Sequence, residues 1–481
     1  MALMPVMWPS FLGFLHFAAA LLVVIRVLLK RRMSPPARLA WILLIEVLPV
    51  VGITAYLLFG EVRMRRAERQ RMADVRNQLT GVWQRAPETV AAVPAYAEPV
   101  VASIEAGGGM EPVRGNRITL LEESDLAIAR LVAALDAAEE EIHLLFYIWL
   151  PDHSGTQVAE AVIRARGRGI AVRLIVDALG SRLLVRSALW GRMQAAGAEC
   201  VRAFPWGNPL VSMLFQRLDL RNHRKIVVID DRLAFTGSRN CADMAFAIKP
   251  RYAPWIDVLM AVEGPVVRQL QAVFLQDWMS YTGQDHGDEL KAVPAADTPG
   301  EIAQVLATGP DLRQERLPDS IATLIHASRS SVTITTPYYV PDEAIDNAIR
   351  SAARRGVRVT LILPERNDSR IVSATSEGYF RELLRAGVRL MLFRGGLLHA
   401  KIVTVDGRMS LSGSANLDRR SFDLNYEVNL FVIDEEFTAV LDHRQQSYIE
   451  RARRLTLEDV EGWTRLRRIR NNLLAIAAPL L

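Results

Sequence analysis

The sequence predicts an α/β protein with two tandem α-β-α halves that form a pseudo-twofold pseudo-dimer, preceded by an amino-terminal membrane helix hairpin. Three observations predict this architecture. Two long apolar runs occupy residues 1–60, strand-like and helix-like segments alternate after residue 116, and the order of those segments occurs twice. The chain has 481 residues, enough for two to three structural units, and 50% of them are hydrophobic. Charged residues make up 23%, so a large part of the chain must face water.

Residues 1–60 are predicted to form a two-helix membrane hairpin. Its apolar runs, 11–29 and 39–59, are each close to the roughly 20 residues that a bilayer-crossing helix needs. No basic segment precedes the first run, so a cleaved signal peptide is disfavoured. Basic residues follow both runs, and two spanning helices would place these basic segments on opposite sides of the membrane. Either one of the segments violates the positive-inside rule, or the hairpin enters the membrane and returns on the same side. Glu46 is costly at mid-membrane unless protonated, paired or near an interface, and Arg26 is one possible partner.

Residues 61–115 are predicted to form a basic juxtamembrane helix, over 61–93, and a linker rich in proline and glycine, over 92–115. Arginines cluster in this helix and again near the carboxyl terminus, which fits either solvated helix faces or contact with anionic lipid head groups. These arginines are Arg63, Arg65, Arg66, Arg69, Arg71 and Arg76, with Arg465, Arg467, Arg468 and Arg470. The two cysteines, Cys200 and Cys241, lack metal-site or disulfide spacing and fit a reducing compartment.

The remaining chain is predicted to be a duplication with halves at 116–295 and 296–481. In the first half we expect strands at 118–121, 142–150 and 171–177, and helices at 125–141 and 155–168. In the second half we expect strands at 331–339, 357–363 and 388–393, and helices at 342–355 and 376–386. The repeat period is about 180 residues, too long for a solenoid, so two paired halves are the natural result.

One segment of the second half carries side chains suited to phosphate chemistry. His399 and Lys401 are two residues apart on a predicted strand, so both side chains leave by the same face. Asp406 follows, and Asn416 comes ten residues after it in a glycine-serine turn. An imidazole, an ammonium and an amide together suit a phosphodiester, which needs a nucleophile or proton shuttle, a fixed cation and a neutral donor.

The same pattern occurs in the first half with identical internal spacing. It comprises His223, Lys225 and Asp230, with Asn240 ten residues after the aspartate. Two such copies are hard to obtain by chance, and we expect them to face each other across the pseudo-twofold axis. A histidine-x-lysine pattern is a poor metal ligand set because the ammonium repels a cation, so no metal is expected. The other histidines are expected to be ordinary core or surface residues.

The paired motifs resemble those of the phospholipase D superfamily. Four further segments narrow the resemblance to bacterial cardiolipin synthases of the two-helix, membrane-bound type. They are the hairpin sequence 48–60 and the stretches 336–342, 418–422 and 478–481. The resemblance implies one active site assembled from both halves. One histidine attacks phosphorus and forms a phosphohistidine, while the other protonates the departing glycerol oxygen and later deprotonates the incoming hydroxyl. By analogy with relatives, we expect His223 to be the nucleophile and His399 the acid/base.

The resemblance also assigns roles to the neighbouring residues. The non-bridging phosphate oxygens would be held by Lys225, Lys401, Asn240 and Asn416. An acidic residue after each motif is expected to orient the imidazole: Glu427 for His399, and Asp257, in the matching slot, for the first half. Asp230 and Asp406 complete the motifs and are expected to hold local structure, because carboxylates beside a phosphate would repel it.

The expected reaction is phosphatidyl transfer from one phosphatidylglycerol to another, giving cardiolipin and glycerol without a cofactor. The alternative is a phospholipase D-type hydrolase, or a head-group transferase that uses another alcohol or phospholipid acceptor. We expect an enzyme of the bacterial inner membrane that binds membrane lipids and no nucleic acid, with its catalytic domain on the cytoplasmic side. The oligomeric state stays open. Trp206 and the apolar loop 210–215 are expected to help exclude water from the second step.

Overall fold

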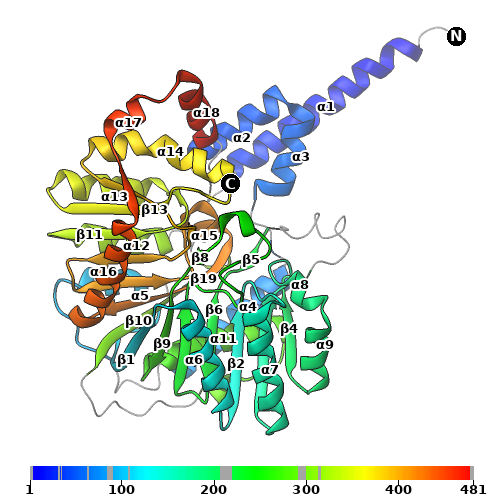
Figure 1. The fold of residues 1–481 in the computed structure, drawn as a ribbon. Helices are drawn as coiled ribbons and strands as arrows, with labels where there is room; N and C mark the ends of the chain where they lie inside the picture. Colours follow the sequence, from blue (N-terminus) through cyan, green and yellow to red (C-terminus); the bar gives the residue numbers. More distant parts are fainter. Residues whose placement is uncertain are drawn as a thin grey trace.

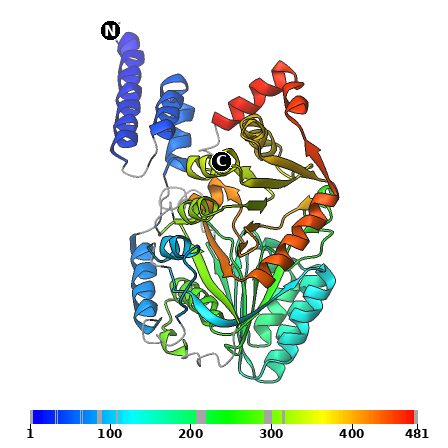
Figure 2. The same cartoon turned by 90° about the vertical axis from the view of Figure 1, so that its left-hand side faces the viewer.

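The computed structural model describes residues 4–30, 33, 35–61, 64, 66–83, 90–106, 109–205, 219–290, 300–312 and 316–476. Two pseudo-equivalent α/β halves share one large sheet, and helices cover its outer faces (Figure 1). The amino-terminal helices project from one end of this body, and the view turned by 90° shows the same separation (Figure 2). The predicted loop 210–215 and Trp206 lie outside the described residues.

The apolar amino-terminal runs form α1 (Met4–Leu29), α2 (Pro35–Val47) and α3 (Pro49–Phe59). The second run was expected to be one helix, but it breaks before Pro49, which has no amide hydrogen to continue the ladder. Gly52 sits against the α2 backbone, where a Cβ would lie 2.5 Å from the carbonyl oxygen of Leu44. Among the described residues, no helix is both long enough and apolar enough to cross a membrane.

A buried carboxylate ties α1 to the end of α3. Arg26 donates to Glu61 over 2.7 and 2.9 Å, and the Tyr56 hydroxyl donates to the same carboxylate over 2.9 Å. The partner suggested for Arg26, Glu46, is instead exposed. Glu61 therefore holds α1 against the end of α3 through charge-assisted hydrogen bonds.

The sheet has a pseudo-symmetric strand order. From the outer edge inward, the first half runs β4-β3-β2-β6-β7-β9-β1, and the second runs β14-β13-β11-β16-β17-β19-β10, with β20 added at its edge. The halves join where β1 and β10 pair antiparallel. Corresponding strands therefore occupy corresponding places, which confirms the predicted duplication.

The strands of the first half are β1 (Val113–Leu121), β2 (Glu141–Phe146), β3 (Ala171–Asp177), β4 (Glu199–Ala203), β5 (Arg221–Asn222), β6 (Lys225–Ile229), β7 (Leu233–Gly237), β8 (Trp255–Ile256) and β9 (Leu259–Glu263). Those of the second half are β10 (Glu301–Thr308), β11 (Ser331–Thr335), β12 (Tyr339–Val340), β13 (Arg358–Pro364), β14 (Arg389–Phe393), β15 (Leu397–Leu398), β16 (Ile402–Val405), β17 (Met409–Gly413), β18 (Leu417–Asp418), β19 (Asn425–Ile433) and β20 (Ala452–Leu455). The predicted strand 171–177 coincides with β3.

The helices of the first half are α6 (Ser124–Asp136), α7 (His153–Gly167), α8 (Arg182–Val185), α9 (Ala188–Ala195) and α11 (Val266–Thr282). Those of the second are α12 (Arg316–His326), α13 (Glu343–Arg354), α14 (Arg370–Arg385), α15 (Arg419–Asp423), α16 (Glu435–Glu450), α17 (Leu457–Glu461) and α18 (Arg465–Ile476). The predicted helix 376–386 is longer in the structure, because Ser369 caps α14 and accepts the amide hydrogen of Val372.

Two segments before the sheet pack onto it. The predicted basic helix appears as α4 (Arg66–Trp83), whose Met72, Val75 and Leu79 are buried in the central core. The predicted linker contains a helix, α5 (Glu98–Ala106), whose apolar side chains pack in the core of the second half. The linker expectation was wrong at α5 because these apolar residues recur at helical spacing and bury one face.

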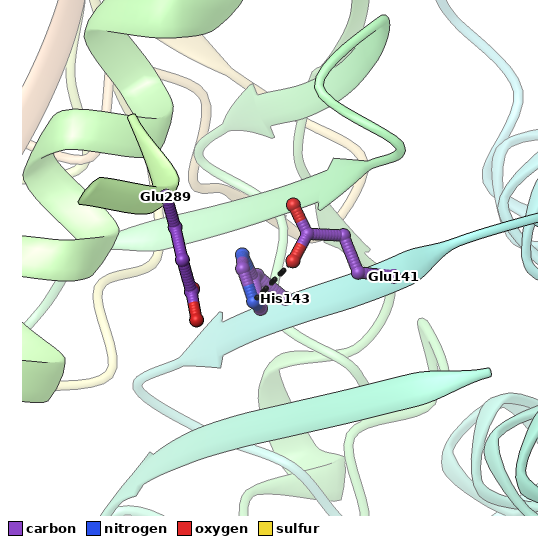
Figure 3. A group of neighbouring side chains, drawn as sticks. All are labelled: Glu141, His143 and Glu289. Atoms are coloured by element: carbon purple, nitrogen blue, oxygen red, sulfur yellow. Dashed lines mark ion pairs between the residues drawn. The ribbon is translucent and has the colours of Figure 1, made fainter. Parts of the chain in front are cut away.

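A polar cluster in the first half resembles a metal site but is occupied by an arginine. Glu141 and Glu289 flank the ring of His143, and their ligand atoms lie within 4.8 Å of one another (Figure 3). Arg173 lies 3.2 Å from His143 Nε2 and donates to Glu289 over 2.5 Å. Burial lowers the pKa of His143 to about 4, and its ring stacks on a phenylalanine. The cluster is therefore a core contact, as expected for this histidine.

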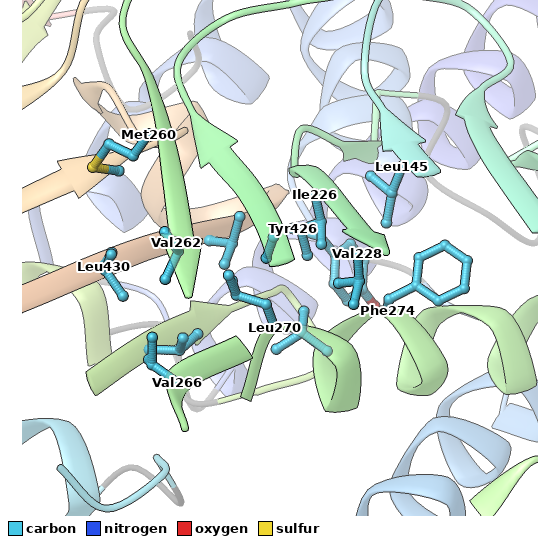
Figure 4. Packing of buried hydrophobic residues seen from close by; sticks show 14 of the residues in the cluster. Leu145, Ile226, Val228, Met260, Val262, Val266, Leu270, Phe274, Tyr426 and Leu430 are labelled. Atoms are coloured by element: carbon cyan, nitrogen blue, oxygen red, sulfur yellow. The ribbon is translucent and has the colours of Figure 1, made fainter. Parts of the chain in front are cut away.

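The main hydrophobic core lies between the two halves. It joins Leu145, Ile226 and Val228 from the first half to Tyr426 and Leu430 from the second (Figure 4). The core also contains much of α11, a helix that is buried along most of its length. Since both halves contribute to one core, the strands that carry the two motifs are held rigidly against each other.

Candidate active site

The two motif histidines line the same cavity. The cavity has a volume of about 300 Å³, and His223, His399, Asn240 and Asn416 all contribute to its wall. This placement confirms the predicted face-to-face arrangement of the motifs. His223 and His399 directly follow the short strands β5 and β15, and lie two and three residues before β6 and β16 rather than within them.

His223 is held by the opposite half of the molecule. The short β5 strand pairs in parallel with the start of β19, and the His223 amide donates to the Tyr426 carbonyl over 2.9 Å. The His223 Nδ1 hydrogen is donated to the Glu427 carboxylate, whose oxygens are 2.9 and 3.0 Å away. The Nε2 atom is therefore the ring nitrogen left with a lone pair for chemistry.

His399 repeats this arrangement with the roles of the halves exchanged. The β15 strand pairs in parallel with β8, and the His399 amide donates to the Ile256 carbonyl over 2.8 Å. Its Nδ1 hydrogen is donated to Asp257 over 2.7 Å.

The expected assignment of carboxylates to histidines was therefore wrong. We expected each carboxylate to orient the histidine of its own half, but Glu427 contacts His223 and Asp257 contacts His399. The reason is topological. Within each half, β7 lies between β6 and β9, and β17 lies between β16 and β19, so the segment with the histidine and the segment with the carboxylate are not neighbours. The histidines follow β5 and β15, which pair with β19 and β8 of the other half, and these pairings bring Glu427 and Asp257 to them.

The serines of the two glycine-serine turns support these carboxylates. The Ser414 hydroxyl donates to Glu427, and the Asn425 side chain donates to the same carboxylate over 3.0 Å. In the first half, the hydroxyl of Ser238 is a hydrogen-bond partner of Asp257. Neither serine was expected to have a role, although both occupy the same position of the repeat.

Burial sets the protonation of the histidine pairs. It lowers the pKa of His223 to about 4 and also lowers that of His399, in both cases against the attraction of the partner carboxylate. Burial alone would raise the pKa of Glu427 and Asp257, but the adjacent histidines hold both below their usual values. At neutral pH the free site thus holds two neutral imidazoles and two ionised carboxylates.

Both motif lysines are buried behind the histidines. Lys225 donates to the backbone carbonyl of His223 over 2.5 Å, and Lys401 does the same to His399. Burial lowers the pKa of Lys225 to about 7 and that of Lys401 to about 8. A buried ammonium without a full counter-charge favours an anionic ligand, because such a ligand would stabilise its charged form.

The motif aspartates serve the fold, as expected. The Asp406 carboxylate accepts the amide hydrogens of residues 329, 330 and 331 over 2.7–2.8 Å. Asp230 accepts from residues 139, 140 and 141 in the same way. Asp230 thus joins the turn after β6 to the start of β2, and Asp406 joins the turn after β16 to the start of β11.

The cavity wall also contains residues that sequence reasoning did not place there. Tyr147 packs edge-on against His223, with ring centroids 4.7 Å apart, and Trp255 lies 4.9 Å from His399. The additional cations of the wall are Arg182, Arg221, Lys249 and Arg420. Arg420 lies in the stretch 418–422, which was one of the segments that carried the family resemblance. That stretch could have pointed to Arg420 as a residue of the cavity wall.

The chain matches a known family over most of its length. The family described as "Cardiolipin synthase, PLD-like domain" matches residues 131–278 and 321–448. The family described as "Phospholipase_D-nuclease N-terminal" matches residues 18–61. Cardiolipin synthase A from Yersinia pseudotuberculosis serotype O:1b (strain IP 31758) is 38% identical, with 98% of each chain covered. Cardiolipin synthase A from Yersinia pestis matches equally well, with 38% identity and 98% of each chain covered.

A solved structure supports the fold independently. The crystal structure of phosphatidylserine synthase from Haemophilus influenzae Rd KW20 aligns with a TM-score of 0.57 and 15% identity. The alignment covers 76% of this chain and 95% of that chain. At this identity the likeness shows the fold alone.

Proposed function

The chain belongs to the cardiolipin synthase family of phospholipase D-like proteins, and we propose that it joins two phosphatidylglycerol molecules into cardiolipin and glycerol. The observation that carries the proposal is the pair of histidines on one cavity, each with Nδ1 bound to a buried carboxylate of the other half. These bonds leave the Nε2 atom of His223 for attack on phosphorus, and that of His399, 3.0 Å from Lys401 Nζ, for proton transfer.

In the first step, His223 Nε2 attacks the phosphorus of one phosphatidylglycerol. The bond between phosphorus and the head-group glycerol oxygen breaks, and that oxygen takes the Nε2 proton of His399. The ring is doubly protonated in the lipid complex, because the bound phosphate anion and Asp257 stabilise its positive charge. Glycerol leaves, and the phosphatidyl group stays on His223. Glu427 stabilises the positive charge that develops on the attacked imidazole, because its carboxylate is 2.9 Å from Nδ1.

In the second step, the now neutral His399 removes the proton from a head-group hydroxyl of a second phosphatidylglycerol. That oxygen attacks phosphorus, the phosphorus–nitrogen bond to His223 breaks, and cardiolipin forms. One phosphodiester is broken and one is made, so no cofactor enters the balance. Asp257 stabilises the protonated state of His399, and its ion pair supports that role.

The lysines and asparagines would hold the non-bridging oxygens in both steps. The positions of Lys225 and Lys401 behind the two histidines support this role, and so do the places of Asn240 and Asn416 in the cavity wall. Fixed ammonium and amide donors lower the barrier because they need no reorganisation when the pentacovalent phosphorus forms.

We also propose that α1 to α3 hold the enzyme at the bacterial inner membrane, with the catalytic halves on the cytoplasmic side. The support is a set of exposed apolar side chains on these helices, including Phe14, Leu22, Leu29, Val47 and Val50. Helices of 13 and 11 residues are roughly 20 and 17 Å long, against a hydrocarbon core of about 30 Å. These lengths favour a hairpin that enters the bilayer and returns.

The test uses the purified full chain in vesicles with phosphatidylglycerol as the only phospholipid. We expect cardiolipin and free glycerol in equal amounts, and neither product from His399→Ala. Phosphatidic acid in place of cardiolipin would identify a hydrolase. Product only after another alcohol is added would identify a different head-group transferase, and unchanged product formation by His399→Ala would refute the proposed mechanism.

A further inference from the structure

The carboxyl-terminal helix α18 has its polar and apolar faces reversed relative to an ordinary surface helix. Leu466, Ile469 and Leu473 are 77%, 64% and 64% exposed. Outside α1 to α3, these are the most exposed large apolar side chains among the described residues. Their spacing of three and four residues places them on one stripe of the helix.

The face that α18 turns toward the protein is polar. Asn471 is 2% exposed and donates to Glu377 of α14 over 2.7 Å. Arg467 donates to the same carboxylate over 2.8 Å, and its guanidinium lies 4.0 Å from the ring centroid of Trp463. These contacts fix the rotation of α18 about its own axis, and the apolar stripe therefore faces away from α14.

Charge on the outer side of α18 is uniformly positive. The helix contains four arginines and no acidic residue. At 100° per residue, Arg465 and Arg470 flank the apolar stripe on its two sides, and both residues are exposed. Arg470 also pairs with Glu377 over 3.5 Å, and its side chain stays 55% exposed. Apolar side chains between basic ones are the pattern of a helix that lies in the plane of a membrane interface.

The location of α18 agrees with such a role. Both views place α18 at the same end of the molecule as α1 to α3 (Figures 1 and 2). A bilayer that contacts those helices can therefore meet α18 as well.

We propose that α18 docks on the surface of an anionic phospholipid bilayer, with Leu466, Ile469 and Leu473 among the acyl chains and the flanking arginines at the phosphates. This second contact, far along the chain from the first, would set the orientation of the catalytic halves over the membrane. The choice of an anionic bilayer rests on the proposed function, which requires phosphatidylglycerol as substrate.

The experiment measures the depth of a fluorophore on the full chain in vesicles of phosphatidylglycerol and phosphatidylcholine. The label is attached at Ile469→Cys in a Cys200→Ser background, since Cys241 is fully buried. The matched control is Leu126→Cys, an exposed leucine (53%) of α6, and this helix lies in the lower part of Figure 1, away from α18 and α1 to α3. Both proteins are assayed for cardiolipin in the same vesicles.

We expect the emission at position 469 to shift to the blue and to be quenched by nitroxide-labelled lipid, and the emission at position 126 to do neither. Quenching at 469 should weaken in pure phosphatidylcholine and at high salt, because the arginine contribution is screened. Equal quenching at both positions would overturn the proposal. So would a blue shift at 469 without quenching, which indicates a protein partner or a second copy.

A second variant separates docking from chemistry. Replacing Leu466, Ile469 and Leu473 with serine should reduce cardiolipin formation on vesicles and leave it unchanged in detergent micelles. The melting temperature should not fall, because these side chains contact no core. If the protein labelled at position 469 makes cardiolipin but its label is not quenched, docking is refuted and the proposed function stands. If its label is quenched but no cardiolipin forms, the proposed function is refuted and docking stands.

Discussion

Exchanging Glu427 or Asp257 for its amide should impair two different chemical events, because each carboxylate serves a different histidine. Glu427→Gln removes the charge 2.9 Å from the His223 Nδ1 atom. Asp257→Asn removes the charge 2.7 Å from the His399 Nδ1 atom. In the proposed mechanism, the first change weakens nucleophilic attack and the second weakens protonation of the leaving group.

The size of the Glu427→Gln effect follows from the geometry. Two unit charges 2.9 Å apart attract by about 6 kcal/mol at an effective dielectric constant of about 20. A glutamine can keep a hydrogen bond to Nδ1, so we expect a loss of about 3–4 kcal/mol in transition-state stabilisation, or about 10²–10³ in rate. Both carboxylates are nearly or fully buried, so solvent cannot replace the lost charge.

The assay is formation of the phosphatidyl-enzyme, measured by rapid quench with radiolabelled lipid. Natural phosphatidylglycerol is compared with an analogue whose leaving group is p-nitrophenolate, which needs no proton to depart. We expect the analogue to restore the rate of intermediate formation in Asp257→Asn and not in Glu427→Gln.

The reverse pattern would refute the assigned roles. Rescue of Glu427→Gln alone would mean that His399 is the nucleophile or that each carboxylate serves the histidine of its own half. His223→Ala and His399→Ala separate these cases, since only the variant that keeps the nucleophile can trap the phosphatidyl group.

Three further predictions concern charge and stability. Lys225 and Lys401 have lowered pKa values of about 7 and 8, and the proposed mechanism uses them as ammonium ions. The value of kcat/KM should therefore fall as the pH rises through that range. The value of kcat should fall only at higher pH, because bound phosphate stabilises the charged lysines. Asp406→Ala should lower the free energy of unfolding by about 1.5–3 kcal/mol at pH 7, measured by urea denaturation. Its contribution should vanish as the pH falls through the lowered pKa of Asp406, and an unchanged midpoint at pH 7 would contradict its structural role. Arg224→Met leaves Asp277 buried without its 2.5 Å partner and should cost about 3–5 kcal/mol, seen as a lower melting temperature; a cost below that of an ordinary surface change would show that the pair is dispensable.

Local sequence was sufficient to find the two motifs and to place the side chains within each. Histidine and lysine two residues apart leave an extended chain on one side, whatever the surrounding fold, so the lysines were correctly placed beside the histidines. The duplication was readable for the same reason, because both copies keep the same spacing and the same order of strands and helices. The limits of the second apolar run were less predictable, since Pro49 and Gly52 act through a close approach of α2 and α3.

Tertiary structure decided how these groups are paired and charged. The sequence determined that the chain has two matching phosphate motifs and two matching carboxylates. It could not show that β7 and β17 separate each histidine from the carboxylate of its own half, so that Glu427 and Asp257 cross between halves. Nor could it show how far burial lowers the pKa of the histidines and lysines. Hydrogen bonding and desolvation depend on which strands meet in space, and that depends on the pairing of the two halves.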